Sequence, residues 1–225
     1  MKNIAIIPAR SGSKALIDKN IKLLNNVPLI GYSIEAAKRS NLFSDIMVST
    51  DSEKYAEIAV SLGADVPFLR SSALSSDTAS SWDVVKEVLS HYQTKFDTVC
   101  LLQPTSPLRT SDDIIEGYKE LELREADAIT SVCLVDHSPL WCTTLDADHS
   151  LIQFRKKETD RPRQQLDDYY RINGALYIRK LKYDNDSVHI LVEHEYAYIM
   201  DRGRSVDIDT IDDFEYAEYL IKKSN

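Results

Sequence analysis

The chain has 225 residues, of which 43% are hydrophobic and 28% are charged, and its formal net charge at pH 7 is −9. These values are typical of a soluble globular protein with one sizeable domain, and the negative charge argues against a surface for nucleic acid or anionic membranes. No apolar run approaches the roughly 20 residues of a membrane span, and no signal-peptide segment precedes the first polar loop, so we expect a cytoplasmic location.

The cysteines and histidines indicate neither a disulfide framework nor a zinc site. The three cysteines, Cys100, Cys133 and Cys142, include no C-x-x-C pair, and the five histidines lack the spacing of zinc ligands. We therefore expect reduced cysteines and no zinc.

The first predicted element is a strand over residues 4–7, closed by Pro8, which has no N–H for a sheet ladder. The loop that follows is rich in groups that bind anions, and Gly12 is expected to let its backbone N–H groups converge. Its candidate donors are the cations Arg10, Lys14 and Lys19 and the neutral residues Ser11, Ser13 and Asn20. Neither Walker A nor Rossmann spacing is present, so the residues alone allow either a solvated turn or a phosphate-binding loop.

The next elements alternate between helix and strand. The pattern predicts a helix opened by Pro28 and ending near residue 40, a strand over 45–51, a helix over 53–62 and a weaker strand over 66–70. Pro67 suggests that the last of these is an edge strand or a strand end. Alternation at this spacing indicates parallel βαβ units and hence an α/β fold.

A helix from about Trp82 to Tyr92 is predicted from apolar spacings of three and four, with several serines before it as N-cap candidates. The near-continuous apolar run over 98–102 is typical of a central strand buried on both faces. It ends at Gln103, which the prolines of the following turn would hold still at the strand's carboxyl end. A rigid connection without a ligand is the alternative interpretation.

A helix over 112–123 and a strand over 128–134 follow, and strand-like runs return at 174–178 and 197–200. In the stretch 205–209, polar and apolar residues alternate, which places Asp207 and Asp209 on one face of an extended segment. Two carboxylates opposite a cationic loop suit Mg²⁺ bound to a nucleotide, although helix-dipole support or simple exposure is the alternative. Thr210 and Asp213 predict a capping box for a last helix.

Several longer motifs lie along the chain: P-A-R-S-G-S-K at 8–14 with K-N at 19–20, D-T-A-S-S at 77–81 after Arg70, L-L-Q-P-T-S-P-L-R at 101–109, P-R-Q-Q-L at 162–166, R-x-N-G-A at 171–175 and the D-x-D at 207–209. Together they resemble the acylneuraminate cytidylyltransferases, or CMP-sialic acid synthetases, over essentially the whole chain. The resemblance implies an α/β, Rossmann-like nucleotidyltransferase fold with a mostly parallel sheet flanked by helices. It also implies a single domain over 1–225, with a small insert at about 135–172 through which two copies form a homodimer.

The implied reaction joins CTP and an acidic nine-carbon sugar, giving the CMP-sugar and pyrophosphate with Mg²⁺ as cofactor. The implied CTP-binding residues are Ala9, Arg10, Ser11, Gly12, Ser13, Lys14, Lys19, Asn20, Arg70 and Ser81. The implied sugar-binding residues are Gln103, Arg163, Arg171 and Asn173, with Arg163 reaching into the neighbouring subunit's site. The implied catalytic residues are Arg10, Lys19, Asp207 and Asp209, of which the two aspartates would hold the metal.

The chain departs from the family pattern at Ala15, where the family has glycine. If the backbone there needs a positive φ, the methyl group costs ~1–2 kcal/mol. If the whole cost fell on the transition state, it would slow the reaction roughly 5- to 30-fold.

Four other functions are the alternatives to CMP-sialic acid synthesis. They are the same chemistry on legionaminic or pseudaminic acid, a Kdo-activating enzyme, a CTP-binding protein without catalysis, and a glycosyltransferase that uses its D-x-D motif.

Overall fold

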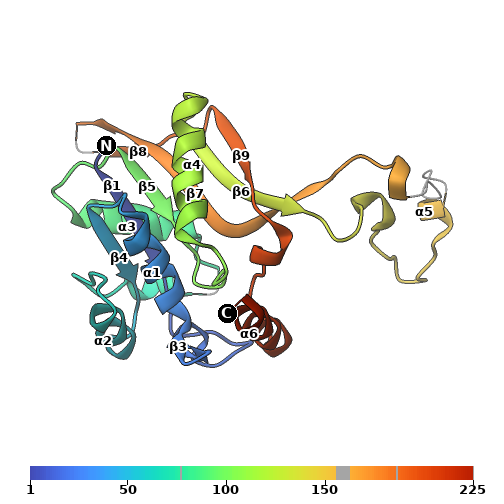
Figure 1. Cartoon of the computed structure of the whole chain (residues 1–225), viewed down its shortest axis with the longest axis horizontal. Helices are drawn as coiled ribbons and strands as arrows, with labels where there is room; N and C mark the ends of the chain where they lie inside the picture. The colour runs from blue at the N-terminus through green and yellow to red at the C-terminus, as the bar shows by residue number, and fades with distance from the viewer. Residues whose placement is uncertain (77, 156–162, 186, 225) are drawn as a thin grey trace.

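A seven-stranded sheet forms the centre of the molecule in the computed structural model, which describes residues 1–76, 78–155, 163–185 and 187–224 (Figure 1). The strands lie in the order β4-β1-β5-β7-β6-β9, and β8 pairs with β7. Their bounds are β1 Asn3–Pro8, β4 Asp45–Ser49, β5 Thr98–Leu101, β6 Ala128–Leu134, β7 Tyr170–Asp184, β8 Ser187–Ile190 and β9 Glu195–Ile199. The short strands β2 Leu23–Leu24 and β3 Val27–Pro28 form a separate antiparallel hairpin.

The sheet is mostly parallel, as predicted. Strand β1 pairs in parallel with β4 and β5, and β9 pairs in parallel with β6. Strand β7 is antiparallel to both of its path neighbours, β5 and β6. The chain crosses from β1 to β4 on one side and later returns to β5 on the other. The carboxyl ends of β1 and β5 therefore flank a topological switch point, where open α/β sheets bind ligands.

Helices cover both faces of the sheet. Since side chains alternate along a strand, Ala5 and Ile7 of β1 face the core formed with α1, α2 and α4, whereas Ile4 and Ile6 face α3. The α-helices are α1 Leu29–Ser40, α2 Glu53–Ser61, α3 Ser81–His91, α4 Ser111–Leu123, α5 Ile152–Arg155 and α6 Ile211–Ser224. The 3₁₀ helices are η1 Lys19–Ile21, η2 Ser72–Ser75, η3 Pro139–Trp141, η4 Arg163–Gln165 and η5 Arg202–Arg204. Within the described ranges, no helix is long and apolar enough to cross a membrane.

The predicted strand over 66–70 was wrong. Asp65 makes a single parallel bridge with Met47, and the chain then leaves the edge of β4. Pro67 offers no N–H with which the ladder could continue. Helix α1 begins one residue later than predicted, because Pro28 is its N-cap rather than its first residue. Strand β8 was not predicted.

The predicted insert corresponds to an arm, residues 135–169, which leaves the body between β6 and β7 (Figure 1). Its described parts, 135–155 and 163–169, contain only the short helices η3, α5 and η4. Pro162, in the predicted P-R-Q-Q-L motif, lies outside the described residues, as does Asp77 of the D-T-A-S-S motif.

Candidate active site

A cavity of about 330 Å³ opens at the carboxyl ends of β1 and β5. Four stretches of the chain meet there: the N-terminal loop (residues 9–20), the stretch from 70 through the start of α3, the glutamine turn (residues 103–109) and the aspartate segment (residues 205–209). The lining residues are Pro8, Arg10, Ser13, Lys19, Asn20, Arg70, Leu74, Ser76, Ala79, Ser81, Val84, Gln103, Pro104, Thr105, Asp207 and Asp209. The cavity therefore joins cationic, amide and carboxylate groups.

The N-terminal loop is held in place by side chains of its neighbours. Ser11 donates from its backbone N–H to Asp51 Oδ1 at 2.8 Å and from its hydroxyl to Asp51 Oδ2 at 3.1 Å. Asn20 Nδ2 donates to the carbonyl oxygen of Arg10 at 2.9 Å, and Tyr55 OH donates to Asp18 Oδ1 at 3.1 Å. Both donors of Ser11 thus bind Asp51, so Ser11 supports the loop and, contrary to expectation, is not in the cavity wall.

The two small residues of this loop do not have the backbone roles expected of them. Gly12 does not have a positive φ, and a Cβ built on it would meet nothing within 4 Å, so the turn does not require glycine. Ala15 does not have a positive φ either. The cost of 1–2 kcal/mol that was conditional on a left-handed backbone at Ala15 therefore does not arise.

Lys19 connects the N-terminal loop to the aspartate segment. Its ammonium donates to the carbonyl oxygen of Ile208 at 2.7 Å and lies 3.1 Å from Asp209 Oδ1. The Lys19 side chain is only 11% exposed, whereas that of Asp209 is 75% exposed. A cation is thereby fixed beside the two carboxylates, although Lys19 and Asp207 are 188 positions apart in the sequence.

Asp207 is the more buried of the two aspartates. Burial raises its pKa and the nearby charge of Asp209 adds to that rise, while a hydrogen bond from Thr105 and the charges of Lys19 and Arg171 oppose it. One oxygen, Oδ1, is buried and has no hydrogen-bond partner in the described part of the chain. A buried carboxylate oxygen without a partner is costly, so this atom is suited to a cation.

The residues present fit a nucleotide-bound Mg²⁺. Among the residues that the structure describes, no group of three or more histidine, cysteine, aspartate or glutamate side chains could hold a metal alone. Mg²⁺ at nucleotide sites, however, takes only one or two carboxylates and completes its shell with phosphate oxygens and water. Asp207 and Asp209, which line the same cavity as the loop cations Arg10 and Lys19, supply that donor set.

The glutamine turn is fixed by a buried arginine. Arg109 Nη1 donates to the carbonyl oxygen of Ala175 at 2.9 Å and to that of Gln103 at 3.4 Å, and Nη2 donates to Ser33 Oγ at 2.7 Å. Burial lowers the pKa of Arg109 to about 10, which still leaves it charged at neutral pH. The Gln103 amide also lies against Gly174, since a Cβ built on that glycine would stand 2.5 Å from Gln103 Oε1.

Gly174→Ala should therefore lower stability and disturb the position of Gln103. Gly174 has φ +77°, which costs an alanine ~1–2 kcal/mol before the clash with the amide is counted. Urea unfolding measures the stability, and Gly12→Ala is the matched control, because Gly12 has neither a positive φ nor a near neighbour. Equal unfolding free energies for the two variants would contradict this account of Gly174.

Arg70 and Ser81, the two residues predicted to meet the nucleoside, both line the cavity, and Ser81 is the first residue of α3. The Arg70 guanidinium donates to the hydroxyl of Ser49 at 2.9 Å and also to its carbonyl oxygen. Burial lowers the pKa of Arg70, and the charge of Asp51 opposes that shift. The N-cap of α3 is Ser80, whose hydroxyl accepts from the Trp82 N–H at 3.2 Å, so Ser81 is not needed as the cap.

Five other predicted site residues do not line the cavity: Ala9, Gly12, Lys14, Arg171 and Asn173. Ala9 is fully buried, and its N–H donates to the carbonyl oxygen of Ser49 at 2.8 Å. Lys14 is exposed. Arg171 donates to the carbonyl oxygen of Ser205 at 3.0 Å, and Asn173 is buried with its amide bonded inside the protein. Arg163 lies in η4 on the arm, and its side chain is outside what the structure describes.

The sequence did not reveal the residues that hold the cavity-lining residues in place. Asp51 follows β4, which pairs in parallel with β1. Because ligands bind at the carboxyl ends of parallel strands, the position of Asp51 could have indicated that it lies near the site. Gly174 and Arg109 stood inside recognised motifs, but no spacing rule connects them to Gln103. Thr105, Ser76 and Ala79 of the cavity wall were likewise not singled out.

A family model described as Cytidylyltransferase matches residues 4–224. The N-acylneuraminate cytidylyltransferase of Escherichia coli O18:K1:H7 is 40% identical over 225 residues, which are 100% of this chain and 53% of that protein. The CMP-N,N'-diacetyllegionaminic acid synthase of Legionella pneumophila is 34% identical, with 99% of this chain and 97% of that protein covered. The pseudaminic acid cytidylyltransferase of Campylobacter jejuni has the same identity and coverage.

Among solved structures, a CMP:2-keto-3-deoxy-manno-octonic acid synthetase complexed with CTP aligns over 100% of both chains with a TM-score of 0.73. At 16% identity this similarity shows the fold alone. The chain spans about half the length of the N-acylneuraminate cytidylyltransferases that it matches.

Proposed function

This chain belongs to the cytidylyltransferase family, and we propose that it transfers the cytidylyl group of CTP to an acidic nine-carbon sugar with release of pyrophosphate. The observation that carries the proposal is the meeting, in one cavity, of Lys19, Gln103 and the Asp207–Asp209 pair. A phosphate-binding cation, an amide donor for a sugar and carboxylates for a metal are the groups that this transfer needs.

In the proposed reaction the anomeric hydroxyl of the sugar attacks the α-phosphorus of CTP, and pyrophosphate leaves in line. Such transfers depend on positioning and charge stabilisation more than on covalent help from the protein. Arg10 and Lys19 would hold the phosphates, with Ser13 and Asn20 beside them in the wall. Asp207 and Asp209 would hold Mg²⁺, which neutralises phosphate charge when bound.

Recognition of the two substrates is assigned to different residues of the cavity wall. Arg70 and Ser81 are proposed to meet the nucleoside. Gln103 is proposed to meet the sugar, because the prolines and Arg109 hold its turn rigid. CTP is a cytoplasmic nucleotide, so we expect the protein to act in the cytoplasm.

N-acetylneuraminic acid is the first proposed sugar, because the relatives named for N-acylneuraminate reach 40% identity. A legionaminic or pseudaminic acid is the second candidate. The observation in its favour is that the relatives named for those sugars match this chain over 97% of their own length.

We also propose that the arm forms a homodimer and that Arg163 reaches a site of the neighbouring subunit. The arm carries apolar side chains that the monomer leaves exposed, including Trp141 at 36%, Leu145 at 56% and Ile152 at 67%. Exposed apolar groups gathered on one projection are typical of an interaction surface. The planar guanidinium of an arginine from the partner would suit the carboxylate of an acidic sugar.

The test is pyrophosphate release with Mg²⁺ from CTP, UTP, ATP and GTP, each with and without the three candidate sugars. Release confined to CTP plus one sugar is the expected result and identifies the substrate. A CTP-dependent rise in melting temperature without release from any sugar would indicate a binding protein instead. Neither release nor stabilisation by CTP would contradict the proposed function.

A further inference from the structure

The aspartate segment has little backbone support of its own. Residues 205–209 belong to no helix or strand, and the N–H of Ile208 donates to the carbonyl oxygen of Thr105 at 2.8 Å. No strand pairing within the described chain fixes the end that precedes Asp207. After Asp207 the segment is fixed by the buried side chain of Ile208 and by the N–H of Asp209, which donates to Asp213 Oδ2 at 3.1 Å. Before Asp207, its placement depends on how side chains anchor residues 204 and 205.

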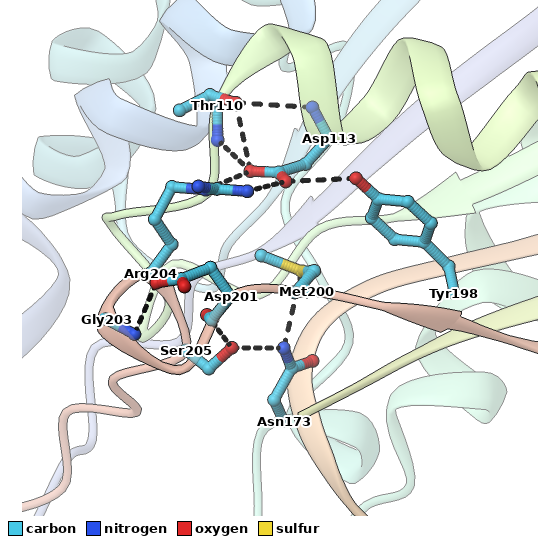
Figure 2. Close-up of polar contacts among 9 residues, drawn as sticks. All are labelled: Thr110, Asp113, Asn173, Tyr198, Met200, Asp201, Gly203, Arg204 and Ser205. Carbon is cyan, nitrogen blue, oxygen red and sulfur yellow. Dashed lines mark hydrogen bonds and ion pairs between the residues drawn. The ribbon is translucent and has the colours of Figure 1, made fainter. Parts of the chain in front are cut away.

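The first anchor is an ion pair between Arg204 and Asp113 (Figure 2). Arg204 Nε donates to Asp113 Oδ2 at 3.2 Å, and Nη2 donates to Oδ1 at 2.9 Å, which is a two-pronged arrangement. The Asp113 side chain is 1% exposed. Burial alone would raise the pKa of Asp113, but hydrogen bonds from Arg204 and Thr110 outweigh burial and lower it. Asp113 is thus held as a carboxylate at neutral pH.

The second anchor holds Ser205 (Figure 2). Its hydroxyl donates to the carbonyl oxygen of Asp201 at 2.8 Å and accepts from Asn173 Nδ2 at 2.9 Å. Asn173 is itself fixed by the hydroxyl of Ser131, which donates to its Oδ1 at 2.6 Å. The carbonyl oxygen of Ser205 accepts from Arg171 at 3.0 Å. Two predicted sugar ligands, Arg171 and Asn173, therefore contact the start of the aspartate segment.

Arg204 is not needed to form the helix on which Asp113 lies. Thr110 and Asp113 complete the capping box of α4 by themselves, with Asp113 Oδ2 accepting from the N–H and the hydroxyl of Thr110 at 2.9 Å each. Tyr198 OH also donates to Asp113 Oδ1 at 3.1 Å. The segment that depends on the Arg204–Asp113 pair is therefore the one around Arg204, which lies three residues before Asp207.

We propose that Arg204 is a positioning residue, whose paired hydrogen bonds to Asp113 set where Asp207 and Asp209 stand relative to the N-terminal loop. The inference rests on the proposed function, because it assigns Arg204 a role in the metal site of that reaction. Residues that orient metal ligands typically contribute 10–100-fold to metal affinity or activity.

The test compares Arg204→Met and Arg204→Lys with the wild type. Mn²⁺ prefers the same hard oxygen ligands as Mg²⁺, and electron paramagnetic resonance reports its binding in the presence of CTP. We expect Arg204→Met to weaken Mn²⁺ binding ~10–100-fold and to raise the half-saturating Mg²⁺ concentration in the pyrophosphate assay by a similar factor. Arg204→Lys should fall between, because lysine keeps the charge but lacks the planar fork.

Tyr198→Phe is the matched control, since it also removes a hydrogen bond to Asp113 but leaves the aspartate segment untouched. We expect it to bind Mn²⁺ like the wild type, even where its melting temperature falls as far as that of Arg204→Met. Equal Mn²⁺ affinity in Arg204→Met and Tyr198→Phe would overturn this inference and leave the proposed function standing. A wild type that binds no Mn²⁺ with CTP would overturn the metal role in the proposed function and the inference with it.

Discussion

Replacing Lys19 with methionine should lower kcat/KM for pyrophosphate release roughly 10²–10³-fold, the range for loss of one fixed electrostatic contact to a transition state. The Lys19 ammonium donates to the carbonyl oxygen of Ile208 and pairs with Asp209, and the Lys19 side chain is only 11% exposed. It needs no reorganisation when charge develops on the leaving pyrophosphate. Methionine keeps a similar unbranched stem, so the packing is preserved while the charge is lost.

Lys119→Met is the control for this substitution. Lys119 is an exposed lysine on α4 that pairs with Glu116 at 2.7 Å and does not line the cavity, so its replacement removes the same charge and one ion pair outside the site. Lys19→Arg should recover part of the activity, because it restores the charge with a different shape. If Lys19→Met and Lys119→Met have equal kcat/KM, the proposed role of Lys19 is wrong.

Asp207→Asn should reduce kcat by a similar factor, roughly 10²–10³-fold, because a metal at a phosphoryl group contributes several kcal/mol of charge stabilisation. The asparagine amide keeps the size of the side chain but supplies a weaker ligand in place of the buried Oδ1. A titration of kcat against Mg²⁺ should show a raised half-saturation point. Asp212→Asn, which changes an exposed carboxylate in the first turn of α6, should leave both values as in the wild type.

The same substitution should increase stability at neutral pH. Burial raises the pKa of Asp207 in the folded state, so the folded protein binds that proton more tightly than the unfolded chain does. The contribution of Asp207 to the free energy of unfolding therefore falls as pH rises from the ordinary carboxyl pKa through the raised one. The stability gain of Asp207→Asn should grow across that range and then level off. Urea unfolding at several pH values measures the gain, and an absent or reversed trend would contradict it.

Sequence patterns predicted most of the helices and strands of the fold. The helices near 29–40, 53–61 and 81–91 and the strands at 45–49 and 98–101 follow from apolar periodicity with proline and serine at the ends. These signals are local, so they predict an element without knowledge of the residues that pack against it. The strand expected over 66–70 failed because Pro67 has no N–H for a ladder and because pairing depends on a partner strand, which a local pattern does not report.

The sequence by itself determined the α/β order of elements and the cationic N-terminal loop, and it singled out Gln103, Asp207 and Asp209 as candidates. Only the tertiary structure decided which groups support them. The hydrogen bonds from Ser11 to Asp51 span 40 residues, and those from Arg204 to Asp113 span 91. Such contacts arise from how parallel strands and their crossovers bring distant segments to one edge of the sheet, and no periodicity along the chain records which side chains then meet.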